Sequence, residues 1–147
     1  MNTTFRNNRL IAAFALAGAM GFLASCQSMG PVTSETITLL GANEVPPVMT
    51  TASGSGTVTI KKDGAVSVHI MVSGMTATAA HIHEGAAGAN GPVIVPFTKT
   101  ADNVFDAPAG AKLTDAQMAS LKAGKLYVNV HSAKNPGGEV RAQLKGN

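Results

Sequence analysis

The stretch "GTVTIKKDGAVSVHIMVSG" (residues 56–74) decides the fold class. Valine and isoleucine occupy every second position on both sides of the dipeptide Asp63-Gly64. A period of two is typical of a β-strand with one buried face, and Asp-Gly between two such runs is typical of a hairpin turn. The stretch therefore predicts two antiparallel strands whose shared buried face consists of Val58, Ile60, Val66, Val68, Ile70 and Val72.

Further strands are predicted downstream of this hairpin. "VIVPF" (93–97) is a short apolar strand, and Pro96 places it at a sheet edge or a bulge. "KLYVNVH" (125–131) and "EVRAQL" (139–144) predict a final hairpin. Its core face would consist of Leu126, Val128, Val130, Val140, Ala142 and Leu144.

One helix interrupts the strands, in "LTDAQMASLKAG" (113–124). Thr114 and Gln117 have the spacing of a capping box, and Gly124 is suited to the end of the helix. Several strands with glycine and proline turns and a single helix indicate an all-β fold. We predict an antiparallel β-sandwich or Greek-key barrel with one short helical crossover.

The N-terminal residues have the pattern of an export signal. Arg6 and Arg9 precede an apolar run from Leu10 to Ala24, which is shorter than the roughly 20 residues of a membrane-spanning helix. The run leads into "LASC" (23–26), which resembles the bacterial lipobox, and Cys26 is the only cysteine. We expect a lipoprotein signal peptide at 1–25, a lipidated tether at 26–34 and one domain at 35–147. The alternative is an ordinary secretory signal that ends near Cys26.

The expected lipid on Cys26 would attach the protein to a membrane. Gln27 stands where an aspartate often retains bacterial lipoproteins at the inner membrane, so we expect a location in the bacterial cell envelope, at the outer membrane facing the periplasm. Another envelope protein is a candidate partner. Lysine and arginine form no cluster with interleaved aromatic residues, which argues against nucleic-acid binding.

Two histidines lie one residue apart in "AAHIHEG" (79–85). On a strand, His81 and His83 would project from one face while Ile82 faces the core, so that both imidazoles could reach one ion. His131 would point away from the core face of its own strand, as would Arg141. We expect the three histidines and Arg141 to share an external face if their strands are neighbours. The alternative is the polar face of ordinary strands.

Imidazole ligands suit copper, with zinc as an alternative. If Gly74 to Ala80 formed a simple hairpin, Met71 would fall opposite His83, which makes Met71 and His69 candidate additional ligands. Solvent exposure of both is the alternative. Arg141 and Glu84 are candidates for supporting the histidines from outside the coordination sphere. Because histidine must be neutral to bind a metal, we expect binding to weaken as the pH falls through about 6 to 5.

Catalytic motifs are weak in this sequence. The glycine-rich "GAAGANGP" (85–92) lacks the Lys-Ser/Thr ending of a phosphate-binding loop, which favours a turn. The serines lack the context of a nucleophile elbow. The motifs therefore do not decide whether the protein is an enzyme, and their weakness favours a protein without enzymatic activity.

Three segments together resemble the CHRD domain, which is named from its occurrence in chordin. They are "ANEVPPV" (42–48), "AAHIHEGAAGANGPVIVPF" (79–97) and "YVNVHSAKNPGGEVRAQL" (127–144), and the resemblance covers about Thr36 to Leu144. It implies a β-sandwich domain found in bacterial exported proteins and animal extracellular proteins, with no generally established enzymatic activity.

A more distant resemblance is to copper/zinc superoxide dismutases. "VSGMTATAAHIHEG" (72–85) is similar to the segment that leads into their H-x-H copper pair, and "VNVH" (128–131) with Arg141 is similar to their last copper histidine and active-site arginine. This implies His81, His83 and His131 as copper ligands and Arg141 as an anion guide. The bridging histidine, the zinc ligands and both disulfide cysteines of that family have no counterparts here.

These observations lead to three hypotheses. The first is a lipid-anchored envelope protein that binds one copper or zinc ion through His81, His83 and His131. The second is a metal-free protein-interaction module of the envelope. The third is an enzyme resembling superoxide dismutase.

The membrane anchor can be tested by replacing Cys26 with serine. Serine cannot accept the thioether-linked lipid, and a lipoprotein is held firmly only by its several acyl chains. We expect C26S to leave the membrane fraction or to remain unprocessed. A mature-sized C26S protein that still fractionates with membranes would contradict the lipobox interpretation.

Overall fold

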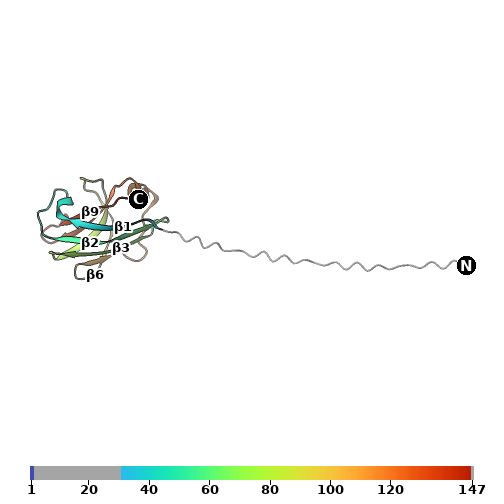
Figure 1. Cartoon of the computed structure of the whole chain (residues 1–147), viewed down its shortest axis with the longest axis horizontal. Coiled ribbons are helices and arrows are strands. Elements are labelled where there is room, and N and C mark those ends of the chain that lie inside the picture. Colours follow the sequence, from blue (N-terminus) through green and yellow to red (C-terminus); the bar gives the residue numbers. More distant parts are fainter. Residues whose placement is uncertain (2–30, 147) are drawn as a thin grey trace.

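The computed structural model describes Met1 and residues 31–146 (Figure 1). Cys26, most of the predicted signal peptide and the start of the tether lie outside the described residues. The described strands are β1 (Pro31–Leu40), β2 (Ser53–Lys61), β3 (Val66–Ser73), β4 (Ala77–Glu84), β5 (Val93–Pro96), β6 (Thr98–Ala101), β7 (Val104–Asp106), β8 (Leu126–Ser132) and β9 (Val140–Gln143). A 3-10 helix, η1 (Gly41–Asn43), follows β1, and one α-helix, α1 (Asp115–Lys122), precedes β8.

The strands form one antiparallel sheet in the order β5-β4-β8-β9-β1-β2-β3-β7-β6. Figure 1 shows part of this order, with β9, β1, β2, β3 and β6 following one another across the barrel. Its two ends, β5 and β6, are separated along the chain by the single residue Phe97. The chain therefore passes directly from one edge of the sheet to the other.

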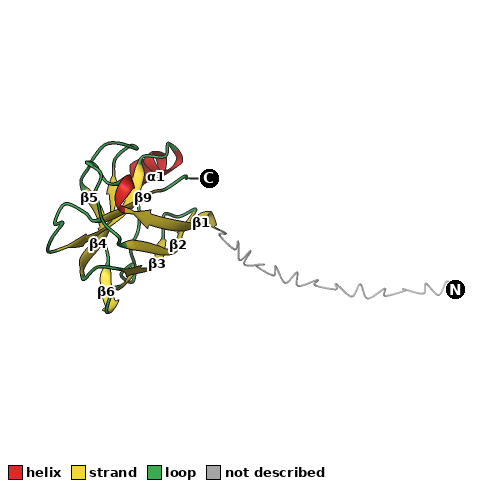
Figure 2. Ribbon diagram, turned by 60° about the vertical axis from the view of Figure 1, so that its left-hand side comes forward, coloured by secondary structure: helices red, strands yellow, loops and turns green. Residues whose placement is uncertain are grey.

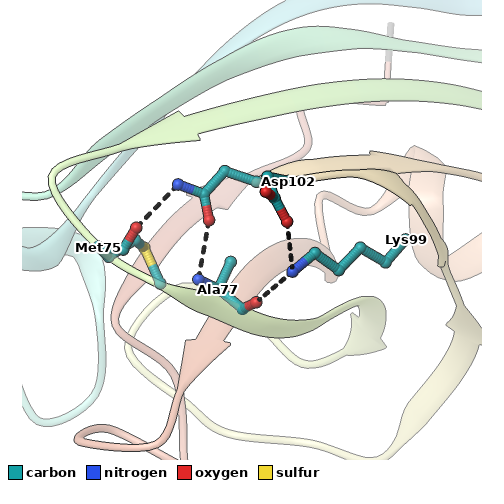
Figure 3. Close-up of polar contacts among 5 residues, drawn as sticks. Met75, Ala77, Lys99 and Asp102 are labelled. Carbon is teal, nitrogen blue, oxygen red and sulfur yellow. Dashed lines mark hydrogen bonds and ion pairs between the residues drawn. The ribbon is translucent and has the colours of Figure 1, made fainter.

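Hydrogen bonds between the first half of β4, which β5 does not cover, and the β6 side of the sheet make the barrel nearly closed. Phe97 donates its backbone N–H to the carbonyl of Ala80 on β4 at 2.9 Å. Lys99 on β6 donates to the carbonyl of Ala77 at 3.3 Å (Figure 3). The side chain of Asn103 holds the same seam, because it accepts from Ala77 N at 2.9 Å and donates to the carbonyl of Met75 at 2.8 Å. The predicted antiparallel all-β fold is confirmed, in its barrel form.

The hairpin predicted from residues 56–74 is formed by β2 and β3, with Ile60 opposite Val66. Burial alternates strictly along β3, as the period of two requires. Gly64 closes the turn with a φ of 85°, and a Cβ atom there would lie 2.5 Å from the carbonyl oxygen of Leu113. Glycine is therefore required both by the backbone conformation and by the neighbouring loop.

The final hairpin and the helix also match the prediction. On β8 and β9, Val128 lies opposite Ala142 and Asn129 opposite Arg141. The capping box of α1 is present, since Gln117 N donates to Thr114 Oγ1 and Thr114 N donates to Gln117 Oε1. Figure 2 shows α1 at one end of the barrel, beside β9. None of the described helices has the length and apolarity that crossing a membrane requires.

One prediction about exposure is wrong. The face of β8 that carries Tyr127, Asn129 and His131 was expected to be external, yet every residue of β8 is buried. The connections that follow β1, β4 and β8 fold back over this face. For example, Tyr127 Oη accepts from Gly91 N at 3.2 Å, and Asn129 Nδ2 donates to the carbonyl of Gly137 at 3.3 Å. The barrel therefore has a second, polar buried layer outside its apolar core.

Candidate metal centre

Three histidines converge because β4 and β8 are neighbours in the sheet. His81 lies opposite Asn129, and His83 lies opposite Tyr127. Directly paired residues share a face, and His131 is two residues beyond Asn129 on that face. One nitrogen from each of His81, His83 and His131 lies within 4.8 Å of the others. The adjacency of strands that the predicted site depends on is thus present.

Backbone carbonyls orient two of the three rings. Nδ1 of His83 lies 2.9 Å from the carbonyl oxygen of Gly91, and Nδ1 of His131 lies 2.9 Å from that of Pro136. A carbonyl can only accept a hydrogen bond, so each Nδ1 carries the proton and each Nε2 carries a free lone pair. Nε2 of His83 is buried and has no hydrogen-bond partner among the described residues.

The ring of His81 faces the lone pair on Nε2 of His131. His81 Nδ1 lies 2.9 Å from His131 Nε2, which is the distance of a hydrogen bond in which His81 is the donor. His81 is partly exposed, whereas His83 and His131 are buried, with 7 % and 8 % of their surfaces exposed. The cluster is therefore open to solvent on the side of His81.

Burial keeps the three imidazoles neutral. It lowers the pKa of His81 to about 4, and the nearby charges of protonated His131 and His83 add to the effect. Burial is also the largest cause that lowers the pKa of His83 and of His131. At neutral pH all three rings are therefore in the form that can bind a metal ion.

A stack of planar groups supports His83. The ring of Tyr127 lies parallel to that of His83, with centroids 4.9 Å apart and an interplanar angle of 7°. On Tyr127 lies the guanidinium of Arg141, whose Cζ is 3.4 Å from the ring centroid. This distance is typical of a close cation–π contact.

Arg141 is enclosed and holds the loop at residues 85–92. It is 1 % exposed, and its guanidinium donates to Asn90 Oδ1 at 3.1 Å and to the carbonyl of Ala89 at 2.9 Å. An anion guide must be reached from solvent, so the role implied by the resemblance to superoxide dismutases is wrong for Arg141. Arg141 contacts the ring of Tyr127, which is stacked on His83, and it also holds the loop whose Gly91 carbonyl orients that histidine.

The glycine-rich segment 85–92 is a turn, as predicted, and it packs tightly against the site. A Cβ atom on Gly91 would lie 1.6 Å from the carbonyl oxygen of Glu84. Tyr127 Oη accepts from Gly91 N at 3.2 Å, and Asn90 Nδ2 donates to the carbonyl of Val45 at 2.7 Å. These contacts fix the position of the Gly91 carbonyl that orients His83.

The other predicted accessory ligands lie elsewhere. β3 pairs with β2 and β7, and the connection after it does not make the hairpin that would have brought Met71 opposite His83. Met71 is 53 % exposed, and His69 Nδ1 lies 2.7 Å from Asp106 Oδ1. Both are wrong as additional ligands.

Glu84 does not support a histidine either. It accepts a hydrogen bond from Ser120 Oγ of α1 at 2.5 Å. Glu84 and His83 are successive residues of β4, and successive side chains of a strand point to opposite faces. The interaction therefore links the sheet to the helix.

Glu44 was not among the site residues predicted from the sequence. This carboxyl group is 4 % exposed, and its Oε1 is buried without a hydrogen-bond partner among the described residues. Burial raises its pKa to about 7, while the charge of Arg141 and a contact with Asn129 oppose the change. A side chain on Gly138 would collide with Glu44 Oε1, so glycine is needed beside it. Local sequence could not predict that the loop carrying Glu44 folds over β8.

The residues of this site lie within a segment that matches a known protein family. The family model of the CHRD domain matches residues 36–144, which include the three histidines, Glu44 and Arg141. No curated protein and no solved structure gives a significant match to the chain.

Glu44 makes the stability of the metal-free domain depend on pH. Because its pKa is raised from 4.5 to about 7, the folded state retains a proton that the unfolded state loses. The stabilisation is full below pH 4.5 and is lost as the pH rises through about 7. Glutamine cannot titrate, so the wild type should lose up to about 3 kcal/mol relative to E44Q over this range.

Urea unfolding of both proteins from pH 4.5 to 8 measures this difference. The histidines titrate with the opposite sign, because their lowered pKa values destabilise the folded state as the pH falls below 6.5. Since both proteins contain them, the difference isolates Glu44. Parallel pH profiles for wild type and E44Q would contradict the raised pKa.

Proposed function

The chain belongs to the CHRD domain family, and we propose that it is a metal-binding member that holds one copper or zinc ion at His81, His83 and His131. The observation that supports this most strongly is the buried Nε2 of His83. It carries a lone pair, lies beside two other imidazoles and has no partner among the described residues. Burying such a group without a hydrogen bond is unfavourable, and a metal ion would satisfy it.

The dimensions of the cluster fit a metal ion. Metal–nitrogen bonds near 2.0–2.1 Å in a planar three-coordinate site separate the nitrogens by about 3.5 Å. His81 Nδ1 and His131 Nε2 are 2.9 Å apart, and the whole set lies within 4.8 Å. Small ring rotations would therefore suffice. His81 would move its proton from Nδ1 to Nε2 on its partly exposed side, so the metal would take the place of that proton.

The carbonyls of Gly91 and Pro136 suit this role. Histidines that bind metals usually donate their other ring N–H to a carbonyl or carboxylate, which fixes the ring and makes the free nitrogen more basic. His83 and His131 both do so. When bound, the ion would supply Lewis acidity or an electron-accepting centre, and the protein's contribution is to hold three neutral nitrogens in place.

We place this domain in the cell envelope, attached through Cys26, on the strength of the "LASC" sequence alone. An enzyme resembling superoxide dismutase is disfavoured, because Arg141 is buried and cannot guide an anion from solvent. The metal-free interaction module becomes the leading hypothesis if the domain binds no metal.

Metal titration of the soluble domain that begins after Cys26 tests the proposal. We expect H81A, H83A and H131A each to abolish or severely weaken binding of copper and zinc. H69A is the matched control, because His69 is an exposed histidine on β3, bound to Asp106, and β3 pairs with neither β4 nor β8. At a free metal concentration 100 times Kd, binding should stabilise the wild type by about 2.7 kcal/mol, observed as a higher Tm.

An unperturbed histidine site would lose its metal as the pH falls through about 6 to 5. We expect this site to lose its metal at a lower pH. Since the pKa of His81 is about 4, protons compete with the metal only at lower pH. Retention of metal at pH 5.5 and its loss near pH 4 are expected. If the wild-type domain binds neither copper nor zinc at micromolar concentration, the proposal is wrong.

A further inference from the structure

We infer that the three-histidine site takes copper as Cu(I) in preference to Cu(II), because the stacked Arg141 and Tyr127 side chains disfavour a divalent ion beside His83. The inference rests on the proposed function and specifies the charge of the ion that the site selects. It assigns to Arg141 a positioning and electrostatic role.

The ligand set provides no negative charge. Within the part of the chain that the structure describes, the converging donors are three histidines and include no carboxylate or thiolate. Neutral imidazole leaves the full charge of the ion in place, and His83 and His131 are largely removed from water. Each additional unit of charge on the ion is therefore poorly solvated, which costs free energy.

A fixed cation lies next to this site. The guanidinium of Arg141 lies 3.4 Å from the centre of the Tyr127 ring, and that ring is parallel to His83 at 4.9 Å. Its hydrogen bonds to Asn90 and Ala89 prevent it from turning toward solvent. The repulsion between this cation and the bound ion grows in proportion to the charge of the ion, and it is stronger here than in water.

The strength of this field depends on any counter-charge beside Arg141. Glu44 is the acidic group that faces Arg141, and burial raises its pKa to about 7. Near neutral pH, Glu44 therefore supplies only part of a counter-charge.

The number of nitrogen ligands that the protein supplies also favours Cu(I). Cu(II) favours a tetragonal arrangement of nitrogen and oxygen ligands. Two adjacent strands supply three nitrogens, and any further ligand would have to come from solvent beside His81. Cu(I) has a filled d shell, like Zn(II), and so has no comparable geometric preference.

Competition titrations with chelators of known affinity, under anaerobic conditions for Cu(I), give Kd for each oxidation state. We expect R141M to raise the affinity for Cu(II) relative to Cu(I) by about tenfold or more, the size of effect typical of residues that support metal ligands. K134M is the matched control. Lys134 is an exposed cation three residues from His131, so it loses the same charge where solvent screens it.

Damage to the fold would lower the affinities for Cu(I) and Cu(II) together. The ratio of the two affinities therefore distinguishes an effect of the Arg141 charge from loss of structure. If R141M does not fold, because Arg141 also holds the 85–92 loop, R141Q provides the second test. Its side-chain amide carries no charge but can still donate hydrogen bonds toward Asn90 and the carbonyl of Ala89. A change in the ratio in either variant, with no change in K134M, supports the inference.

An unchanged ratio in the folded variants would overturn the inference and leave the metal site intact. A wild-type domain that favours Cu(II) would also overturn it. A wild type that binds zinc but neither copper ion would overturn the inference alone. If the wild type binds neither copper nor zinc, the proposed function itself fails, so the two failures can be told apart.

Discussion

The antiparallel register of β4 with β8 is the constraint on which the site depends. With Ile82 opposite Val128, the side chains of His81, His83 and His131 must lie on the other face of the same two strands. A shift of one residue would turn the histidines into the apolar core and Ile82 out of it. The completely buried Ile82 and Val128 make such a shift costly, so packing of the core also holds the cluster together.

This arrangement requires a polar layer to be buried outside the core, and backbone groups satisfy most of it. Gly91, Pro136 and Ala89 direct carbonyl oxygens at His83, His131 and Arg141 respectively. The loops that supply these carbonyls lie within the segments 79–97 and 127–144 that resemble the CHRD family. A close contact explains one of their glycines, Gly91, where any side chain would collide with the carbonyl of Glu84. Within the described part of the chain, buried polar atoms of His83, Asn129 and Glu44 have no hydrogen-bond partner, and all three residues lie in this layer.

Much of the fold could be predicted from the sequence, because its signals are local. The alternation around Asp63-Gly64 predicted the hairpin, and the alternation in residues 126–144 predicted which residues of the last two strands face the core. The set of three histidines also followed from strand periodicity, on the condition that two strands were neighbours. Whether β4 and β8 are neighbours is a non-local property, and it became known only from the structure.

The errors have a common cause. Periodicity shows which face of a strand is apolar, but it does not show whether a distant loop covers the other face. His131 and Arg141 were therefore expected at an external surface and are buried. Likewise, nothing in residues 74–80 indicates that β4 does not pair with β3. Because the two strands are not paired, Met71 and His69 lie away from the site. Backbone carbonyls such as that of Gly91 have no residue signature, so their role could not be predicted.

The central claim is that this domain binds one metal ion through three imidazole nitrogens from β4 and β8. X-ray absorption spectroscopy of the copper-loaded soluble domain tests it most directly. The claim predicts three nitrogen neighbours at roughly 2.0 Å with the multiple-scattering pattern of imidazole. A sulfur neighbour near 2.3 Å, or fewer than three imidazoles, would contradict it.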